Sequence, residues 1–215
     1  DFYDAFTLSN DQIGLVIADV CDKGVGAALF MALFRSLIRI FSVGETKLQE
    51  TGTSINLIHH NALQAVRLTN DYVTQNHWQM SMFATLFFGV LDPNTGLLSY
   101  VNGGHEPLFI INQDGIIKQM LNSTGPAVGM MPNMKFEIQE VKLYPGEMLI
   151  GYTDGVTEAK CPEGKLFTDK RLKELVEKPA NSGSELIDRI KDRLFDYMED
   201  APQFDDITIL AVRRN

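Results

Sequence analysis

The sequence predicts an α+β fold in which two antiparallel sheets pack together and helices cover both outer faces. Apolar, strand-like segments follow one another from residue 82 to residue 154, with turn residues and no helical segment between them. One pair of helix-like segments precedes this region and another pair follows it. Elements segregated in this way favour an α+β fold over alternating β-α-β units, and a four-layer αββα sandwich would bury every apolar run.

The first part of the chain predicts a central strand and a helix pair. Residues 12–19 are apolar on both alternating faces, as in a strand that is covered on both sides. Residues 25–42 are apolar almost throughout, so we expect a largely buried helix there. Its strongly polar positions are Arg35, Ser36 and Arg39. Residues 52–69 predict a second, moderately amphipathic helix, for which the candidate N-caps are Thr53 and Ser54.

Strand-like segments separated by turn residues come next. In chain order they are residues 82–92, 97–104, 107–120, 136–143 and 148–154. Asp114-Gly115 predicts a tight hairpin within the third segment. The alternation of apolar and polar residues slips at Glu140-Val141, which predicts a β-bulge in the fourth segment.

Two helices and a strand end the chain. The helices are expected over residues 168–177 and 183–198, with Thr168 and either Ser182 or Ser184 as N-caps. Residues 205–214 predict a strand that begins with two acids. Since no repeat and no linker-like segment is visible, we expect residues 1–215 to form one domain.

The composition narrows the classes of function. The 215 residues include 28 acidic and 19 basic ones, for a net charge of −9. This balance disfavours non-specific binding to nucleic acid or to an anionic membrane, and it suits a divalent cation or a basic protein surface. The longest apolar run, near residues 25–34, is too short to span a bilayer. Two cysteines make no disulfide framework, so we expect a cytoplasmic protein.

Three strand-like segments carry an Asp at one end. Asp19 follows LVIA, Asp154 follows MLIGYT, and Asp205-Asp206 precede ITILAV. Carboxylates that converge without matching bases need a hard cation, and Mg²⁺ or Mn²⁺ suits oxygen ligands better than Zn²⁺ does. A two-metal hydrolase is therefore one interpretation. The alternative is that each Asp is a turn or cap residue, because spacing alone does not establish convergence.

Five motifs carry a resemblance to a known family. DFYDAF, IADVCDKGVGAALFMA, NGGHEPLFII, GYTDGVTEA and FDDITILAV occur in the order found in the SpoIIE/RsbU-type bacterial branch of the PP2C (PPM) protein serine/threonine phosphatases. The resemblance runs from the first residue to the last strand. It implies a β-sandwich flanked by helices, with a dinuclear Mn²⁺ or Mg²⁺ centre at one rim.

The resemblance also implies the ligands of these ions. Asp19 would bridge both metals, and the backbone carbonyl of Val20 would be a further ligand. Asp154 and Asp205 would hold the first metal, so the residues expected to carry the chemistry are Asp19, Asp154 and Asp205. Asp206 takes the position that is often Asn in the family and is the alternative to Asp205.

The start of the chain matches the acidic motif of the family only in part. Asp1 would reach the second metal, directly or through water, whereas Asp4 is expected to be structural. The two glycines that precede this motif in the family are missing here. We therefore expect a trimmed N-terminal edge and a C-terminal piece of a longer sensor protein.

Other motif residues are expected to support the fold. Gly24 and Gly26 would let the chain leave the metal loop where a side chain would crowd the acids. Asp22 is expected to be solvated, and His105 to be a hydrogen-bonded structural residue. Other residues expected to have no chemical role are His59, His60, His77 and Cys21, and the expected supports of Asp154 are Thr153 and Thr157. A solvated stripe is the simplest interpretation of Arg35 and Arg39.

The predicted activity is hydrolysis of phosphoserine or phosphothreonine on a protein by a metal-activated water. The resemblance suggests a phosphorylated STAS-domain anti-anti-sigma factor as substrate and a homodimer formed through an upstream sensor region. Two alternatives stay open at this point. GGHEP superficially resembles the GGDEF signature of diguanylate cyclases, although His105 replaces the central acid. A degenerate phosphatase fold that only docks a partner is the other alternative.

Overall fold

The computed structural model describes residues 1–44 and 55–215, without the side chains of residues 10, 44 and 55–62. It divides the chain into two compact units, which are described one at a time. Unit 1 comprises Asp1, Glu106–Asn122 and Leu143–Asn215, and unit 2 comprises Phe2–His105 and Ser123–Lys142. That residues 1–215 form one domain stays a prediction.

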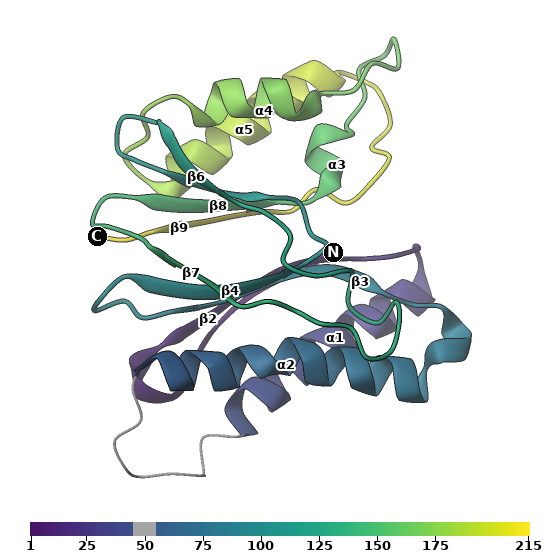
Figure 1. The fold of residues 1–215 in the computed structure, drawn as a ribbon. Coiled ribbons are helices and arrows are strands. Elements are labelled where there is room, and N and C mark those ends of the chain that lie inside the picture. The colour runs from purple at the N-terminus through teal and green to yellow at the C-terminus, as the bar shows by residue number, and fades with distance from the viewer. Residues whose placement is uncertain (45–54) are drawn as a thin grey trace. The chain divides into compact units, whose positions relative to one another are not determined.

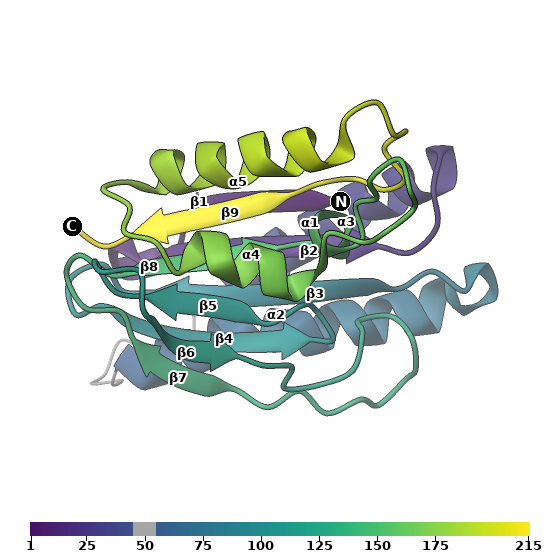
Figure 2. The same cartoon turned by 90° about the horizontal axis from the view of Figure 1, so that it is seen from above.

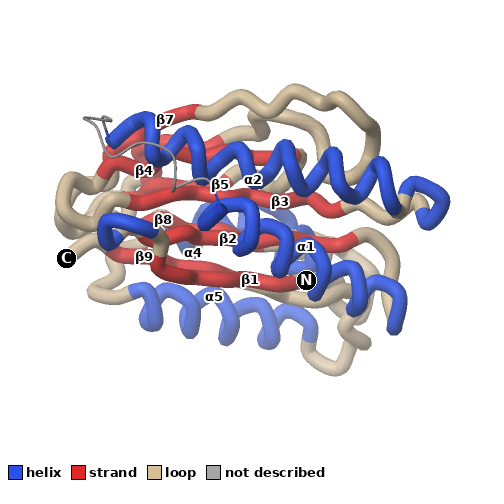
Figure 3. The backbone as a smooth tube through the Cα atoms, turned by 90° about the horizontal axis from the view of Figure 1, so that it is seen from below, coloured by secondary structure: helices blue, strands red, loops and turns tan. Residues whose placement is uncertain are grey.

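Unit 2 is a five-stranded antiparallel sheet with a helix pair on one face, as Figure 3 shows. The strand order is β1-β2-β3-β4-β7. The strands are β1 (Phe2–Thr7), β2 (Ile13–Val20), β3 (Ala84–Leu91), β4 (Leu97–Gly103) and β7 (Gln139–Lys142). The helices are α1 (Val25–Gly44) and α2 (Ile55–Asn76), and the 3₁₀ turns are η1 (Ser9–Asp11) and η2 (Trp78–Met80).

The core of unit 2 lies between the helices and the sheet. Phe34 and Ile38 of α1 and Val66 of α2 are fully buried in one cluster with Leu86 and Phe88 of β3. Alternate residues of β3 form an apolar face, and this face packs against the apolar faces of both helices.

Helix α1 differs from the prediction, because it is only partly buried. Val25, Leu29, Ile40 and Val43 are exposed. The apolar residues lie all around α1, and a helix that packs on one sheet face and beside one neighbouring helix covers only part of its circumference. Its apolar stretch is also longer than predicted. By length and composition alone, Val25–Val43 could cross a membrane, and 28% of that stretch is buried.

Arg35 and Arg39 of α1 bind the carboxylate of Asp4 in β1, so the solvated stripe was a wrong prediction. Arg39 donates two hydrogen bonds, from Nε to Oδ2 at 2.6 Å and from Nη2 to Oδ1 at 2.7 Å. Arg35 Nε lies 3.1 Å from Oδ2. The side chain of Asp4 is 6% exposed, and its hydrogen bond from Arg39 lowers its pKa. Asp4 is therefore structural, as the sequence predicted.

Unit 1 is a four-stranded antiparallel sheet in the order β6-β5-β8-β9, with α4 and α5 across one face (Figure 2). The strands are β5 (Leu108–Ile111), β6 (Ile117–Leu121), β8 (Met148–Tyr152) and β9 (Ile209–Arg213). The helices are α3 (Asp154–Thr157), α4 (Thr168–Val176) and α5 (Gly183–Met198). Leu186, Ile190 and Leu194 of α5 pack into the core of this unit.

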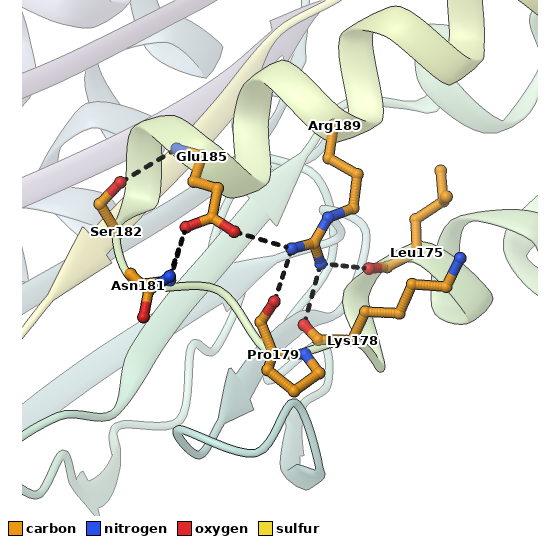
Figure 4. A network of polar contacts seen from close by, with 7 residues as sticks. All are labelled: Leu175, Lys178, Pro179, Asn181, Ser182, Glu185 and Arg189. Carbon is orange, nitrogen blue, oxygen red and sulfur yellow. Dashed lines mark hydrogen bonds and ion pairs between the residues drawn. The ribbon is translucent and has the colours of Figure 1, made fainter.

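Arg189 of α5 closes the C-terminal end of α4 (Figure 4). Its guanidinium donates hydrogen bonds to the carbonyl oxygens of Leu175, Lys178 and Pro179, and it also pairs with Glu185. The last carbonyls of a helix have no partner within the helix, so a cation with several donors is well suited to this position. Ser182 accepts a hydrogen bond from the backbone N–H of Glu185, which makes it the N-cap of α5.

The predicted fold class is confirmed: the chain is α+β, with two antiparallel sheets and helices. Each unit supplies one sheet and one layer of helices (Figure 1). The hairpin at Asp114-Gly115 is also confirmed, because the backbone N–H of Gly115 donates to the carbonyl of Asn112 and Gly115 has φ +84°.

Several local predictions were wrong. The pairing of β7 with β4 is regular through Glu140 and Val141, and the register shift lies instead between Ile110 and Ile111. Thr168 is no N-cap, because that position belongs to Phe167, which makes no side-chain cap. The last strand begins at Ile209, after the acids rather than with them. Helix α2 ends at Asn76 rather than at residue 69. Its proposed caps, Thr53 and Ser54, lie outside the described residues.

Candidate metal and phosphate site

Unit 2 contributes the end of β2. Asp19 is half-buried and Val20 is buried, and both belong to the ladder between β2 and β3, where Asp19 faces Thr85 and Val20 faces Ala84. The backbone N–H of Cys21 continues this pairing to the carbonyl of Phe83 at 3.0 Å. The predicted ligands therefore lie on a paired strand that is buried almost to its end.

Positive φ angles at two residues shape the turn that follows this strand. Asp22 has φ +69°, and its Oδ1 accepts a hydrogen bond from the N–H of Lys23 at 2.8 Å. Asp22 is exposed, as predicted. Gly24 has φ +89°, a value that favours glycine. The predicted crowding is wrong, because no described atom lies within 4 Å of a Cβ built on Gly24 or Gly26.

His105 supports the strand next to Asp19. It is buried, its backbone N–H donates to Asn102 Oδ1 at 2.8 Å, and its Nδ1 lies 3.1 Å from Thr85 Oγ1. Thr85 in turn faces Asp19 across the ladder. The prediction of a structural His105 fits these contacts. Sequence reasoning missed Thr85, because its partners are 20 and 66 positions away and no local pattern marks it.

The contacts of His77 and Cys21 fit the expectation that neither residue has a chemical role. His77 packs against the rings of Phe30 and Tyr72, at centroid distances of 5.6 and 5.8 Å. The side chains of His59 and His60 lie outside the described ones. Cys21 Sγ accepts a hydrogen bond from the N–H of Phe83 at 3.2 Å, so it is part of the strand end.

Unit 1 contributes Asp154, the half-buried first residue of α3. The neighbouring threonines hold the backbone around it. Thr153 is buried, and its Oγ1 accepts a hydrogen bond from the N–H of Thr208 at 3.1 Å. Thr157 Oγ1 donates to the carbonyl of Asp154 at 3.2 Å. The predicted support of Asp154 thus acts through its backbone and through the segment that leads into β9.

A glycine brings the second acidic segment of unit 1 close to Asp154. A Cβ on Gly155 would overlap the backbone oxygen of Asp206. The absence of a side chain there lets residues 205–206 lie directly against the first turn of α3. Asp205 is half-buried and accepts a hydrogen bond from the N–H of Asp206, whose side chain is 75% exposed. This difference fits Asp205 as the preferred ligand and Asp206 as the alternative.

Asp1 offers a carboxylate oxygen suited to a cation. Its side chain is 6% exposed, and its amino terminus lies 3.3 Å from Asp206 Oδ2. Its Oδ2 is buried and has no hydrogen-bond partner among the described residues. Because an uncompensated buried carboxylate is costly, this oxygen fits a divalent cation. The predicted donor set, of carboxylates and one backbone carbonyl, is of the kind that Mn²⁺ and Mg²⁺ prefer.

Glu106, which sequence reasoning did not single out, belongs to the same negative environment. Burial raises its pKa, and the charges of Asp169, Asp154 and Glu158 raise it further. Tyr152 donates to Asp169 Oδ1 at 3.0 Å, and burial raises the pKa of its phenol. The surroundings of Asp154 in unit 1 are thus rich in acids, as a cation site requires.

The structure brings together part of the predicted set. Within unit 1 the Asp154 turn lies against residues 205–206, and Asp1 lies beside Asp206. Asp19 and Val20 belong to unit 2. Among the described residues, no group of three or more His, Cys, Asp and Glu residues is placed to hold a metal ion. The complete ligand set therefore stays a prediction.

The comparisons with known proteins first define a class. The chain matches the mycobacterial structure described as the RsbU and RsbW domains of Rv1364c from Mycobacterium tuberculosis, with 27% identity and a TM-score of 0.70 over 99% of this chain and 56% of that one. It also matches the SiaA-PP2C domain of Pseudomonas aeruginosa, with 24% identity and a TM-score of 0.73 over 100% of this chain and 80% of that one. The fold is that of the PP2C phosphatases.

The family model then identifies the family. Residues 9–215 match the model of stage II sporulation protein E, so the chain belongs to the SpoIIE family. It is 53% identical over its whole length to the protein IcfG of Synechocystis and 29% identical to the phosphoserine phosphatase RsbU of Bacillus subtilis. The chain spans 36% of the length of IcfG and 59% of the length of RsbU. The resemblance predicted from the five motifs is confirmed, and the diguanylate cyclase alternative is excluded.

Proposed function

We propose that this chain is a metal-dependent protein serine/threonine phosphatase that hydrolyses phosphoserine or phosphothreonine on a partner protein. The observation that carries the proposal is the family match over residues 9–215, and the motifs that resemble those of the family contain Asp19, Asp154 and Asp205. The alternative of a degenerate docking module is not favoured, because these three acids are all present and RsbU is a phosphoserine phosphatase.

We propose that the residues that hold the cations are Asp1, Asp19, the Val20 carbonyl, Asp154 and Asp205, with Asp206 as the alternative to Asp205. Two bound Mn²⁺ or Mg²⁺ ions would supply a water of lowered pKa and positive charge opposite the phosphoryl oxygens. The buried oxygen of Asp1 and the acid-rich surroundings of Asp154 support this assignment.

The protein's own contribution is to keep carboxylates in place before substrate arrives. The backbone of Asp19 is fixed by the β2–β3 ladder, and the backbone of Asp154 is fixed by Thr157. Carboxylates that already lie in place do not have to reorganise when the metal ions bind, so less of the binding free energy is lost. A buried nucleophilic side chain is not needed, because water is the attacking group in this reaction class.

The partner is proposed from the family. RsbU and RsbP of Bacillus subtilis are phosphoserine phosphatases, and the mycobacterial relative carries an RsbU and an RsbW domain in one structure. We propose a phosphorylated STAS-domain protein as the substrate of this chain, in a partner-switching pathway in the cytoplasm. We also propose that the full-length protein forms a homodimer through a region upstream of this domain.

The proposal is tested by Mn²⁺-dependent release of phosphate from a phosphorylated STAS-domain protein. Asp19→Asn and Asp154→Asn should each lower kcat/KM by at least about 100-fold, because each removes an electrostatic contribution to the transition state. Asp22→Asn is the matched control, since Asp22 is an exposed acid three positions from Asp19. Unchanged rates in Asp19→Asn and Asp154→Asn would refute the proposed function.

A further inference from the structure

Two segments that lie wholly or mostly in unit 2 carry no charged residue. Residues 72–91 and residues 119–134 contain no Asp, Glu, Lys or Arg, in a chain whose net charge is −9. The first segment runs from the end of α2 through η2 into β3, and the part of the second segment in unit 2 lies in the loop that leads into β7. Figure 3 shows this loop beside the second half of α2.

Hydrogen bonds hold these segments against each other. Asn70 of α2 accepts from the N–H of Gly129 at 2.9 Å and donates from Nδ2 to the carbonyl of Met131 at 3.1 Å. Ala84 and Val128 exchange two backbone hydrogen bonds, of 2.9 and 2.8 Å. A Cβ on Gly129 would lie 3.1 Å from the carbonyl oxygen of Met82, so the loop is in close contact with the segment after η2.

The joined segments expose large apolar side chains. The exposed residues are Tyr72, Trp78, Met80, Met130 and Met131, with exposed fractions from 38% to 68%, and they are called the Trp78 patch below. Tryptophan, tyrosine and methionine are the residue types that are enriched in the centres of protein interfaces. Methionine also adapts its shape to a partner. A concentration of such residues on an exposed surface indicates a binding surface.

The Trp78 patch is joined to the strand end that carries Asp19. Ser81 directly follows η2, and Cys21 Sγ donates to its carbonyl at a distance of 4.0 Å. Phe83 exchanges two further hydrogen bonds with Cys21, one from each backbone N–H. Cys21 is two positions from Asp19. The segment that carries Trp78 and Met80 is therefore hydrogen-bonded to the strand end two positions from the predicted metal ligand.

We infer that the Trp78 patch is the docking surface for the folded phosphoprotein substrate. The patch would contact an apolar surface of the substrate next to its phosphorylated residue. This inference rests on the proposed function. A phosphoserine carries a charge of about −1.5 to −2 at neutral pH, so its protein would be repelled by an acidic surface. An uncharged patch lacks this repulsion and offers apolar contact, whereas a cationic partner would need acidic contacts, so the patch favours the substrate as its occupant.

Trp78 provides a direct readout of docking, because it is the single tryptophan in the chain. The probe is a phosphorylated STAS-domain protein that contains no tryptophan, added with EDTA so that hydrolysis does not occur. Docking should shift the Trp78 emission to shorter wavelength as its indole is buried, with saturation at an excess of the probe. No shift at any probe concentration would overturn the inference.

Kinetics provide the second test. We compare kcat/KM for the phosphorylated STAS-domain protein with kcat/KM for p-nitrophenyl phosphate, which has no protein surface. In Trp78→Ala and in the Met80→Ser/Met131→Ser double variant, the ratio of the two should fall about tenfold. The controls Ile116→Ser and Phe195→Ser, two exposed apolar residues of unit 1, should leave the ratio unchanged. An unchanged ratio in the patch variants would overturn the inference.

The outcomes separate the inference from the proposed function. If the wild-type chain hydrolyses neither substrate while the Trp78 emission still shifts, the proposed function fails and docking is supported. If both substrates are hydrolysed without a shift, the phosphatase stands and the docking surface is wrong. If the patch variants change the sedimentation coefficient of the chain alone, the patch joins two copies of this chain and the inference is wrong.

Discussion

Asp19 and Thr85 face each other across the β2–β3 ladder, and Thr85 Oγ1 lies 3.1 Å from Nδ1 of the buried His105. This contact links the GGHEP turn to the strand that carries the predicted bridging ligand. The contact accounts for the presence of His105 in this motif by a structural role.

Thr85→Val should destabilise the chain by about 1 kcal/mol, because it leaves a buried imidazole nitrogen without the Thr85 hydroxyl and keeps the shape of the side chain. Chemical denaturation measures this difference. Thr7→Val, at an exposed position of β1, is the control and should change stability by less than about 0.5 kcal/mol. Equal stability of Thr85→Val and the wild type would show that the hydroxyl does not hold His105.

Gly155→Ala should impair both folding and activity. Its Cβ would overlap the backbone oxygen of Asp206, so residues 205–206 must move away from the first turn of α3. We expect a loss of about 1–3 kcal/mol in the free energy of unfolding, the typical range for steric overpacking. We also expect weaker Mn²⁺ binding in calorimetry, since Asp205 moves with this segment.

Gly26→Ala is the matched control for that substitution. Gly26 is the second residue of α1, no described atom is within 4 Å of the position that its new methyl group would take, and its φ is not positive. Alanine in a helix is favoured over glycine by about 0.5–1 kcal/mol, so this variant should be as stable as the wild type or more so. Destabilisation by Gly26→Ala equal to that of Gly155→Ala would remove the steric explanation.

Asp4 makes the stability of the chain depend on pH in the acid range. Its pKa is lowered in the folded state by the hydrogen bond from Arg39, so it binds a proton more weakly than in the unfolded chain. Its contribution is therefore complete above the unfolded pKa of about 3.9 and is lost as the pH falls through the lower folded pKa. Asp4→Asn should be less stable by about 2 kcal/mol at pH 7, the scale of a hydrogen bond to a charged group.

The pH dependence of that difference is the deciding measurement. Urea titrations of the wild type and Asp4→Asn should give a constant difference in the free energy of unfolding from pH 7 to about pH 5 and a shrinking one below about pH 4. A difference that stays constant down to pH 2 would show that the charge of Asp4 does not matter.

Arg189→Met should destabilise α4 and α5 together. The substitution keeps much of the apolar stem and removes the donors to the carbonyls of Leu175, Lys178 and Pro179. We expect a loss of about 1.5–3 kcal/mol in thermal or urea unfolding. Arg193→Met, an exposed arginine one turn further along α5, should cost less than about 0.5 kcal/mol. Equal effects of the two substitutions would contradict the capping role.

The sequence predicted the elements whose residues follow a regular pattern. The central strand near residues 13–20, the hairpin at Asp114-Gly115 and helix α5 with its Ser182 cap all have local signals, and all are present. The class of fold followed from the order of these elements. The five motifs then identified the family.

The main wrong or missing predictions concern residues whose partners are far away in the sequence. The solvated stripe of Arg35 and Arg39 was a wrong prediction, because both side chains bind Asp4, which lies 31 and 35 positions before them in the chain. The burial of α1 was overestimated, because composition does not say how many neighbours cover a helix. Thr85 and Glu106 were missed for a similar reason, since their partners come from distant parts of the chain. Asp19, Asp154 and Asp205-Asp206 became candidates because they stand at the ends of apolar runs, whereas Asp1 was suggested by the family resemblance.

The proposed function requires Asp19 and Asp154 to hold the same metal ions. Calorimetric titration of Mn²⁺ into the wild type, Asp19→Asn, Asp154→Asn and the double variant tests it most directly, without an assay of activity. If the two residues share ions, the double variant should lose far less binding free energy than the two single losses added together, because each single substitution already breaks the common site. Additive losses, or Mn²⁺ binding unchanged in either single variant, would contradict the claim.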